Sequence, residues 1–224
     1  GLARLSSLVP QTMEKAGLDL NLFGDPWPVL DEKLRTWKPD LVGFSFRNMD
    51  PLAQIHPSYF PVLQTAVNLA RRRLPDARII CGGPGFSLFA ESILELLPSL
   101  DYGIRGEGEL PLLQLMEGIM AHRDQSQSMD IPGLIYRNNS HTGEAHQQIP
   151  NLDELPIPDY SDYFRDLESL GSRYAFLPRL PMEISRGCWW SKGAQSKGGG
   201  GCAFCNLNLQ WSGYRQKSRE RTVL

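Results

Sequence analysis

The sequence predicts an α/β protein in which a doubly wound, Rossmann-like parallel sheet is followed by the beginning of an α/β barrel. Two observations support this fold class. Through the first half of the chain, short apolar runs alternate with amphipathic stretches, as they do in βαβ units. Near the C-terminus, the short strand expected at 180–185 runs directly into a loop rich in glycine and cysteine. α/β barrels keep their chemistry at such carboxyl ends of strands.

Alternating helices and strands fill the N-terminal part. Helices are expected where apolar residues recur with helical spacing, and they end at breakers such as Gly17 and Pro75. Strands are expected where short apolar runs are bounded by turn residues. The expected helices cover residues 3–16, 29–37, 61–74, 87–97 and 109–122. The expected strands cover residues 18–23, 40–45, 78–81 and 102–105.

This order of elements divides the chain into three parts. Residues 1–125 form the α/β domain, and 126–178 hold a hairpin (131–136 with the segment near Ile149) and a proline-rich linker. Residues 179–224 supply the first strand, the cysteine loop and the first helix of the barrel. A doubly wound domain would open with a strand before its first helix, and more barrel strands would follow the last helix. The sequence therefore looks truncated at both ends, or completed by another chain.

Composition narrows the function classes. A net charge of −2 and a pI near 6.1 do not indicate a polyanion such as nucleic acid as a partner. The longest apolar runs are far shorter than a membrane span. The chain has four cysteines, three of them close together, and no secretory signal is recognisable, so a reducing cytoplasm is the expected location.

Three cysteines near the C-terminus carry the chemistry. Cys202 and Cys205 are two residues apart, and a glycine-rich stretch of thirteen residues separates them from Cys188. Glycines let a backbone fold tightly around a cofactor. Three thiolates can hold three irons of a [4Fe–4S] cube and leave the fourth iron open to a substrate or cofactor, whereas an electron-carrying cluster is usually closed by four cysteines. The loop therefore predicts a catalytic cluster.

A zinc site is the alternative for the same cysteines. Structural zinc normally takes four protein ligands, so one more would be needed. The other candidates, Cys81 and the four histidines, lie at least 42 positions away in sequence. Cys81 itself is interpreted as a buried strand residue. The cluster is the preferred interpretation.

Three expected strands end in loops that suit a ligand. The loops follow the strands at 40–45, 78–81 and 102–105, and in doubly wound sheets ligands bind beyond the carboxyl ends of the strands. Glycines in two of these loops would let the backbone lie against a cofactor. The candidate binding residues are Ser45, Arg47, Gly82, Gly83, Pro84, Gly85, Gly106, Glu107 and Gly108.

The run Arg-Gly-Cys188 followed by Cys202-Ala-Phe-Cys205 resembles the radical S-adenosylmethionine (SAM) superfamily. The first gap of thirteen residues departs from the usual three, and with Trp189 and Trp190 it resembles a subgroup that modifies ribosomally made peptides. The resemblance implies that the three cysteines ligate the [4Fe–4S] cluster, that the open iron binds SAM, and that Phe204 lies near its adenine.

The loops at 82–85 and 105–109 resemble those of the cobalamin-binding domain that precedes the radical SAM barrel in one large class of these enzymes. The resemblance implies that the glycine loops and Ser45 contact cobalamin. The signature Asp-x-His-x-x-Gly, which places a histidine under the cobalt, is absent. Arg47 is the candidate to face the cobalt without coordinating it, and His56 is its rival.

The resemblance implies a cobalamin-dependent radical SAM enzyme, and in particular a C-methyltransferase acting on an unactivated carbon of a peptide or small molecule. An electron donor such as flavodoxin or ferredoxin is implied as a partner. The alternatives are a ring-rearrangement or cyclisation enzyme without methyl transfer, a non-catalytic cobalamin- or metal-binding module, and a zinc-stabilised interaction domain. The sequence identifies no general base.

Overall fold

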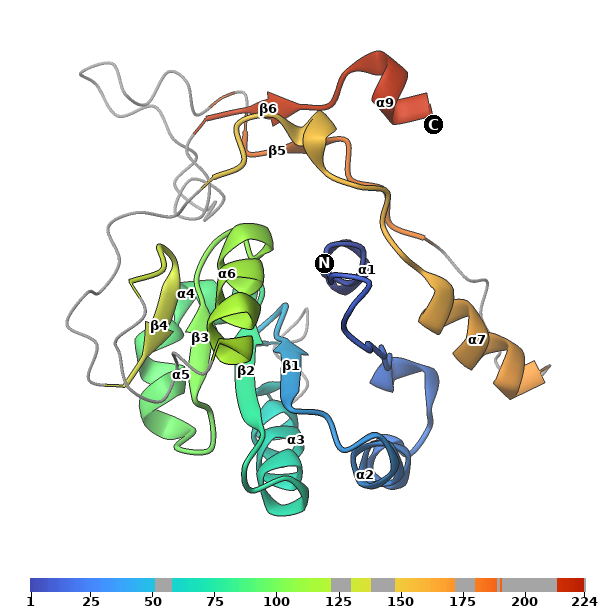
Figure 1. Cartoon of the computed structure of the whole chain (residues 1–224), viewed down its shortest axis with the longest axis vertical. Coiled ribbons are helices and arrows are strands. Elements are labelled where there is room, and N and C mark those ends of the chain that lie inside the picture. The colour runs from blue at the N-terminus through green and yellow to red at the C-terminus, as the bar shows by residue number, and fades with distance from the viewer. Residues whose placement is uncertain are drawn as a thin grey trace. The chain divides into compact units, whose positions relative to one another are not determined.

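The computed structural model describes residues 1–50, 58–121, 130–137, 148–171, 180–188, 190 and 213–223 (Figure 1). The chain forms two compact units: unit 1 comprises Gly1–Gln147 with Pro158–Ala175, and unit 2 comprises Gln148–Ile157 with Phe176–Leu224. The segment that the sequence assigns to a hairpin and linker is thus shared between the units, and the three-part division stays a prediction. None of the described helices has the length and apolar character needed to cross a bilayer.

A parallel sheet forms the centre of unit 1, as the sequence predicts. Strands β1 (Leu41–Ser45), β2 (Arg78–Gly82) and β3 (Tyr102–Ile104) are parallel and lie side by side in chain order. β4 (Leu134–Tyr136) adds antiparallel to β3. Among the described residues, β4 pairs with β3 and not with the segment near Ile149, so the expected hairpin of 131–136 with that segment is not observed. Residues 138–147 lie outside the described residues.

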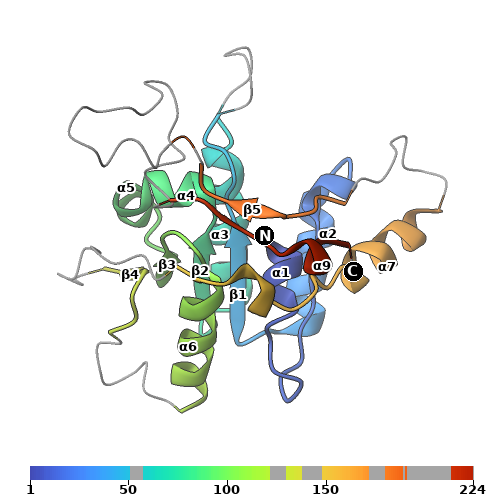
Figure 2. The same cartoon turned by 90° about the horizontal axis from the view of Figure 1, so that it is seen from above.

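Helices cover both faces of the sheet, which makes it doubly wound. The bounds are α2 (Pro26–Trp37), α3 (Phe60–Arg73), α4 (Pro84–Leu88), α5 (Ala90–Leu96) and α6 (Glu109–Met120). Because neighbouring strand residues face opposite ways, Ile79 packs with α2, α3 and α5, whereas Ile80 packs with α6. In Figure 2 the sheet lies between α6 on one side and α3, α4 and α5 on the other.

The first elements differ from the sequence prediction. The helix expected at 3–16 is only α1 (Leu2–Ser6), and turns follow it. Pro10 lacks an N–H group and would clash inside a longer helix. The strand expected at 18–23 is a 3₁₀ turn, η1 (Leu20–Leu22), because the Asp19 carboxylate accepts a hydrogen bond from the Asn21 N–H at 3.0 Å. Such a local bond holds the backbone in a turn rather than in a ladder.

Two further predictions of extent need correction. The helix expected at 87–97 is broken at Phe89 into α4 and α5, which lets Phe86 and Ile93 both reach the core. The strand expected at 180–185 is reduced to β5 (Ser185–Arg186), since only these residues find a partner strand, β6 (Arg215–Gln216), among the described residues. Unit 2 also contains η3 (Leu152–Glu154) and α9 (Arg219–Val223).

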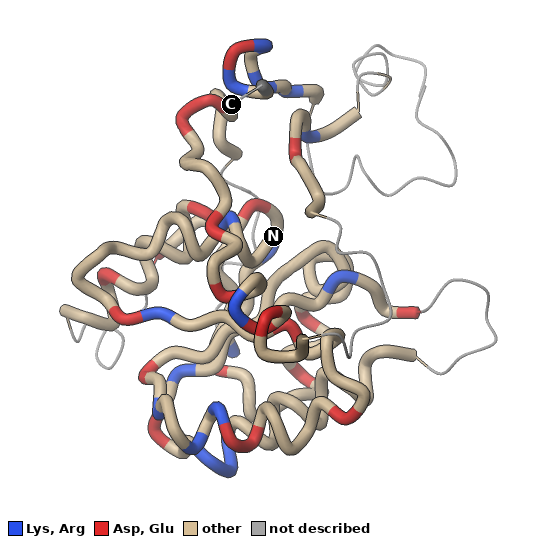
Figure 3. Tube along the Cα trace, turned by 90° about the vertical axis from the view of Figure 1, so that its right-hand side faces the viewer, with Lys and Arg blue, Asp and Glu red and all other residues tan. Residues whose placement is uncertain are grey.

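Charges of both signs are interspersed along the described chain (Figure 3). The densest basic run is Arg71–Arg73 at the end of α3. Arg71 forms an ion pair with Asp101 at 2.6 Å, and Arg73 forms one with Asp31 at 2.5 Å. Two of the three arginines thus serve unit 1 itself, so this run does not argue for a polyanion site.

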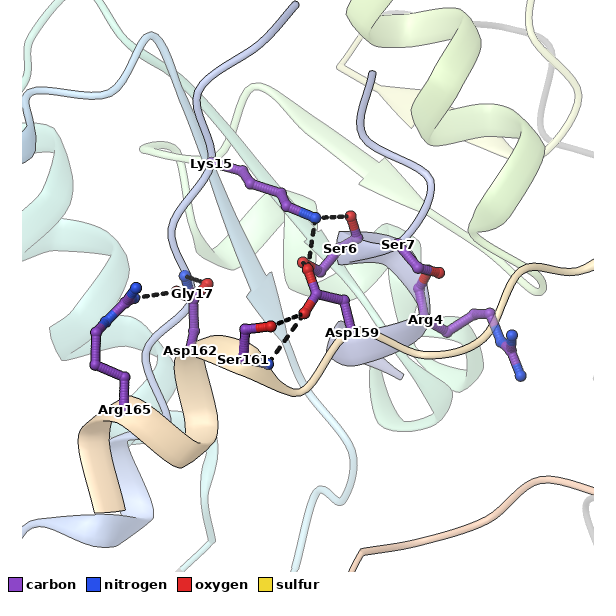
Figure 4. Close-up of polar contacts among 9 residues, drawn as sticks. All are labelled: Arg4, Ser6, Ser7, Lys15, Gly17, Asp159, Ser161, Asp162 and Arg165. Atoms are coloured by element: carbon purple, nitrogen blue, oxygen red, sulfur yellow. Dashed lines mark hydrogen bonds and ion pairs between the residues drawn. The ribbon is translucent and has the colours of Figure 1, made fainter. Parts of the chain in front are cut away.

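The last part of unit 1, α7 (Ser161–Leu170), is fastened to the N-terminal segment through Asp159 (Figure 4). The Asp159 N–H donates to the Ala3 carbonyl at 2.8 Å. Its carboxylate accepts hydrogen bonds from Lys15 Nζ at 2.7 Å and from Ser6 Oγ at 3.3 Å. A residue that the sequence assigns to the linker is therefore a tertiary contact of the first domain.

Three residues further on, in the first turn of α7, Asp162 makes a second contact with the N-terminal segment. Its carboxylate accepts a hydrogen bond from the Gly17 N–H at 2.5 Å and also pairs with Arg165. At the first contact, hydrogen bonds from Lys15 and Ser161 favour the ionised carboxylate and hold the pKa of Asp159 well below its usual range. A carboxyl whose pKa is lower in the folded chain adds stability above its unfolded pKa, about 4, and loses that contribution as the pH falls further.

We expect Asp159→Asn to lower the free energy of unfolding by about 1 kcal/mol at pH 7, because the Lys15 and Asp159 side chains remain 35% and 27% exposed and solvent weakens their attraction. The difference from wild type should shrink by pH 3, because the carboxyl of the unfolded wild-type chain takes up a proton below about pH 4 while the folded one stays ionised. Urea denaturation followed by circular dichroism at both pH values measures this. Glu32→Gln, which removes an exposed ion pair within α2, is the control. An equal effect of both changes would contradict the prediction.

Candidate functional site

Three loops meet at the carboxyl edge of the sheet in unit 1. The first loop (46–50) follows β1, the second (83–86) follows β2 and includes the first turn of α4, and the third (105–108) follows β3. Ser45 is in register with Gly82, and Cys81 with Gly103, so the strands end side by side. The structure thereby brings together the candidate residues that the sequence placed on three separate loops.

The backbone of Phe46 joins the first loop to the second. Its N–H donates to the Gly82 carbonyl at 2.7 Å, and its carbonyl accepts from the N–H groups of Gly85 at 3.0 Å and Phe86 at 3.2 Å. The Phe46 side chain is buried in the core. Sequence reasoning missed this residue because its contribution comes from backbone atoms, which leave no signature in residue type.

Close approach of the two backbones explains two glycines. A Cβ atom at Gly83 would lie 2.7 Å from the Phe46 carbonyl oxygen, and one at Gly85 would lie 2.9 Å from the carbonyl group of Arg47. Gly83 also has a φ of 104°, which only glycine adopts readily. From the sequence, these glycines are expected to let the backbone lie against a cofactor. In the structure, their lack of a side chain is needed for the contact between the loops.

The second and third loops are joined by a side chain. Ser87 Oγ accepts a hydrogen bond from the Gly106 N–H at 2.9 Å and donates to the Gly83 carbonyl at 2.9 Å. An ion pair between Arg105 and Glu91 of α5 lies close to this link. Ser87 was not among the candidate residues, because a serine at the start of an expected helix is an ordinary finding.

The candidates differ in how much of each remains open to a ligand. Ser45, Arg47 and Pro84 are exposed, and Gly82, Gly83, Gly106 and Gly108 are partly exposed. Gly85 and Glu107 are buried, Glu107 to 5% exposure. The edge therefore presents glycine and proline backbone, a hydroxyl group and a guanidinium group. Such a surface fits a large flat ligand with polar substituents, which can lie on exposed backbone and hydrogen-bond at its rim.

Gly103 supports the edge from beneath. A Cβ atom there would come within 2.1 Å of the Phe86 ring, and Phe86 is fully buried. The bare backbone of β3 thus leaves room for the side chain that anchors the second loop. A glycine inside an apolar strand is the sequence signal that could have indicated this close packing.

In unit 2, Cys188 follows β5 and Gly187. The two ends of the cysteine loop are in contact with each other. β5 and β6 pair antiparallel, with Arg186 opposite Arg215. A Cβ atom at Gly187, whose φ is 79°, would lie 1.8 Å from the Gly213 carbonyl oxygen. Gly187 is therefore required for the loop base. Cys202, Phe204 and Cys205 lie outside the described residues, and the part that is described contains no group of three metal-ligating side chains.

Residues 215–221, which follow the cysteine loop, form hydrogen bonds with residues 149–155 of unit 2. Arg215 donates to the Ile149 carbonyl at 2.6 Å, and Arg221 donates to the Leu155 carbonyl at 2.9 Å. Between them, the Ser218 N–H donates to the Asp153 carboxylate at 2.9 Å. Two basic residues of this segment, Arg215 and Arg221, thus hold unit 2 together.

The distant ligand that zinc would need is not supplied by Cys81. This thiol is fully buried in β2, and burial raises its pKa to about 12, so it stays protonated. A zinc ligand must be an ionised thiolate. His56, His122, His141 and His146 lie outside the described residues.

A protein family and several known proteins resemble this chain over the region that includes the edge. Residues 7–116 match the B12 binding domain family. The chain is 26% identical to an uncharacterized methyltransferase of Pyrococcus horikoshii, over 100% of this chain and 44% of the relative. It is 31% identical to a tryptophan 2-C-methyltransferase of Streptomyces laurentii, over 63% of this chain and 23% of the relative.

A further relative belongs to a different reaction class. An anaerobic magnesium-protoporphyrin IX monomethyl ester cyclase of Cereibacter sphaeroides is 26% identical over 87% of this chain and 28% of the relative. The chain thus spans less than half the length of these relatives.

A solved structure shares the fold of the chain. It is the radical SAM methyltransferase TsrM from Kitasatospora setae, which superimposes with a TM-score of 0.70 over 99% of this chain and 41% of TsrM at 23% identity.

We expect Gly83→Ala to destabilise unit 1 by about 2 kcal/mol, because the new Cβ atom meets the Phe46 carbonyl and the φ of 104° is strained for alanine. Gly82→Ala is the matched control, since the nearest atom to its Cβ would be 3.6 Å away. Thermal unfolding of both variants measures the difference. Equal unfolding temperatures would show that the two loops do not need this close approach.

Proposed function

We propose that the chain, whose residues 7–116 match the B12 binding domain family, is part of a cobalamin-dependent radical SAM C-methyltransferase. The observation that carries the proposal is the carboxyl edge of the sheet, where three joined loops present backbone and polar groups within the matched B12-binding region. When bound, cobalamin supplies the methyl group, and the cluster with SAM supplies the radical that removes a hydrogen from substrate.

The residues of the edge would bind and orient cobalamin. Ser45 is exposed at the end of β1, so its hydroxyl can hydrogen-bond to the ligand. The partly exposed backbone at Gly82, Gly83 and Gly106 can lie against the macrocycle or its nucleotide tail. Pro84, Gly108 and the buried Gly85 and Glu107 complete this set, the buried members through the shape of their loops.

Arg47 would face the cobalt. It is exposed in the first loop, one residue after Phe46, whose backbone is hydrogen-bonded to the second loop. The Arg47 backbone is therefore held in place while the residue stays accessible. A guanidinium group remains protonated and cannot coordinate a metal. The Arg47 guanidinium group would lie near the cobalt without coordinating it and would keep competing ligands away.

Cys188, Cys202 and Cys205 would hold the [4Fe–4S] cluster through their thiolates and leave one iron for SAM. The fastened loop base supports this assignment for Cys188, because the contact of Gly187 with Gly213 fixes the point at which the loop starts. Phe204, just before the last cysteine, would lie against the adenine of SAM. An electron donor such as flavodoxin or ferredoxin would reduce the cluster.

The substrate is proposed to be a peptide or a small molecule. The peptide is favoured by the resemblance of the cysteine loop to peptide-modifying enzymes. One observation favours a second function: the magnesium-protoporphyrin ester cyclase relative covers more of this chain than the tryptophan methyltransferase does. Cyclisation or ring rearrangement without methyl transfer is therefore the second candidate.

Anaerobic reconstitution with iron and sulfide, followed by iron counting and electron paramagnetic resonance, tests the cluster. We expect about four irons per chain in wild type, loss of iron in Cys202→Ala, and a reduced signal that changes when SAM is added. Cys81→Ala is the control, since this buried thiol is far from the loop in sequence. One zinc and no iron per chain would overturn the radical SAM assignment.

Absorption spectra of bound cobalamin test Arg47. We expect Arg47→Ala to shift the spectrum, because removal of the guanidinium group lets water or another ligand approach the cobalt. Arg72→Ala, an exposed arginine in the last turn of α3, should leave the spectrum unchanged. Identical spectra for wild type and Arg47→Ala would rule out a position of Arg47 at the cobalt.

A further inference from the structure

Among the described residues, the strand pairing that leads into the second and third loops is short. β2 and β3 pair only through Ile80 with Tyr102 and Cys81 with Gly103. Directly after β3, the Arg105 N–H donates to the Gly133 carbonyl at 2.8 Å, on the side of β4 and away from β2. The pairing of β2 with β3 thus ends at Cys81 and Gly103, before the loops of the candidate site begin.

Ser87 joins the second and third loops through its one hydroxyl group. A serine hydroxyl has one hydrogen to donate and two lone pairs to accept. Here the hydrogen serves the Gly83 carbonyl and a lone pair accepts from the Gly106 N–H, both at 2.9 Å. Ser87 is half-buried, so the bonds are shielded in part from water. Its backbone N–H also donates to Gly83 at 2.9 Å, which fixes the serine on the second loop.

We propose that Ser87 is a positioning residue of the cobalamin site, with its hydroxyl setting the spacing between the second and third loops. The proposal rests on the cobalamin function proposed above. The first and second loops are joined by backbone hydrogen bonds of Phe46 to Gly82, Gly85 and Phe86. The second and third loops are joined by the side chain of Ser87, so a substitution there acts directly on their spacing. Gly82 and Gly83 on one loop and Gly106 and Gly108 on the other would change their separation if the hydroxyl were removed.

Titration of the 224-residue chain with hydroxocobalamin, followed by absorption, tests this role. Ser87→Ala should weaken the affinity about three- to tenfold, the range expected for the loss of a partly buried hydrogen bond. Ser87→Thr should bind within about twofold of wild type, since threonine in a helix can place its Oγ toward the carbonyl four residues back. Rescue by threonine distinguishes the hydroxyl from the space that the side chain fills.

Two controls separate positioning from general stability. Glu91→Gln removes the ion pair with Arg105, which links nearby segments without touching the Gly106 N–H, and should bind cobalamin as wild type does. Ser99→Ala makes the same chemical change at the opposite end of β3, where Ser99 Oγ donates to Asn68 at 2.9 Å. Thermal unfolding of each variant is measured beside the titration, and Ser87→Ala should lose affinity beyond any loss that Ser99→Ala shows at a comparable unfolding temperature.

The outcomes are distinguishable. If wild type binds hydroxocobalamin and Ser87→Ala binds equally well, Ser87 has no positioning role and the proposed function stands. If Ser87→Ala and Ser87→Thr weaken binding alike, or only in proportion to lost stability, the role is structural and the inference is wrong. If wild type itself does not bind, the proposed function fails, and this inference fails with it.

Discussion

The close approach of two backbones at the carboxyl edge of the sheet is the constraint on which the candidate site depends. The carbonyl of Phe46 accepts two hydrogen bonds from the second loop, and this is possible only because Gly83 and Gly85 have no Cβ atom. Beneath them, Phe86 occupies the space that Gly103 leaves open. Backbone contacts of this kind fix a loop more firmly than side-chain contacts, because no rotamer freedom has to be lost in forming them. The edge is thereby a prepared surface, and a ligand need not order it.

The path of the chain is a second constraint. It leaves unit 1 after residue 147, returns at 158 and leaves again after 175, so unit 1 is built from two separate stretches of sequence. Asp159 and Asp162 fasten the returning stretch to the N-terminal segment, with bonds to Ala3, Lys15 and Gly17. In unit 2, Arg215 and Arg221 hold the carbonyl groups of residues 149 and 155. The stretch 148–171 is therefore an ordered component of both units rather than a simple spacer.

The cysteine loop begins from an equally defined base. Gly187 lies against Gly213, and the short pairing of β5 with β6 brings together residues 29 and 31 positions apart. Closing a loop has an entropic cost that grows only slowly with its length, so the longer gap between the first and second cysteines adds little to that cost. The unusual spacing of the cysteines is thus consistent with the proposed cluster.

The sequence by itself determined the fold class and most of the elements of unit 1. Apolar runs such as 78–81 and breakers such as Pro75 act locally, so strands β1 to β3 and helices α2, α3 and α6 could be predicted from residue type and spacing. It also indicated which loops carry the candidate site, because the carboxyl ends of parallel strands meet at one edge. It misjudged residues 3–23, where Pro10 and the bond within the Asp19 turn outweighed apolar periodicity. Only the tertiary structure decided what each loop residue does. Gly83 and Gly85 serve contact between loops, Ser87 joins the second loop to the third, and Asp159 belongs to the first domain. These roles depend on which backbone atoms lie opposite one another across long stretches of sequence, and neither residue type nor spacing encodes that.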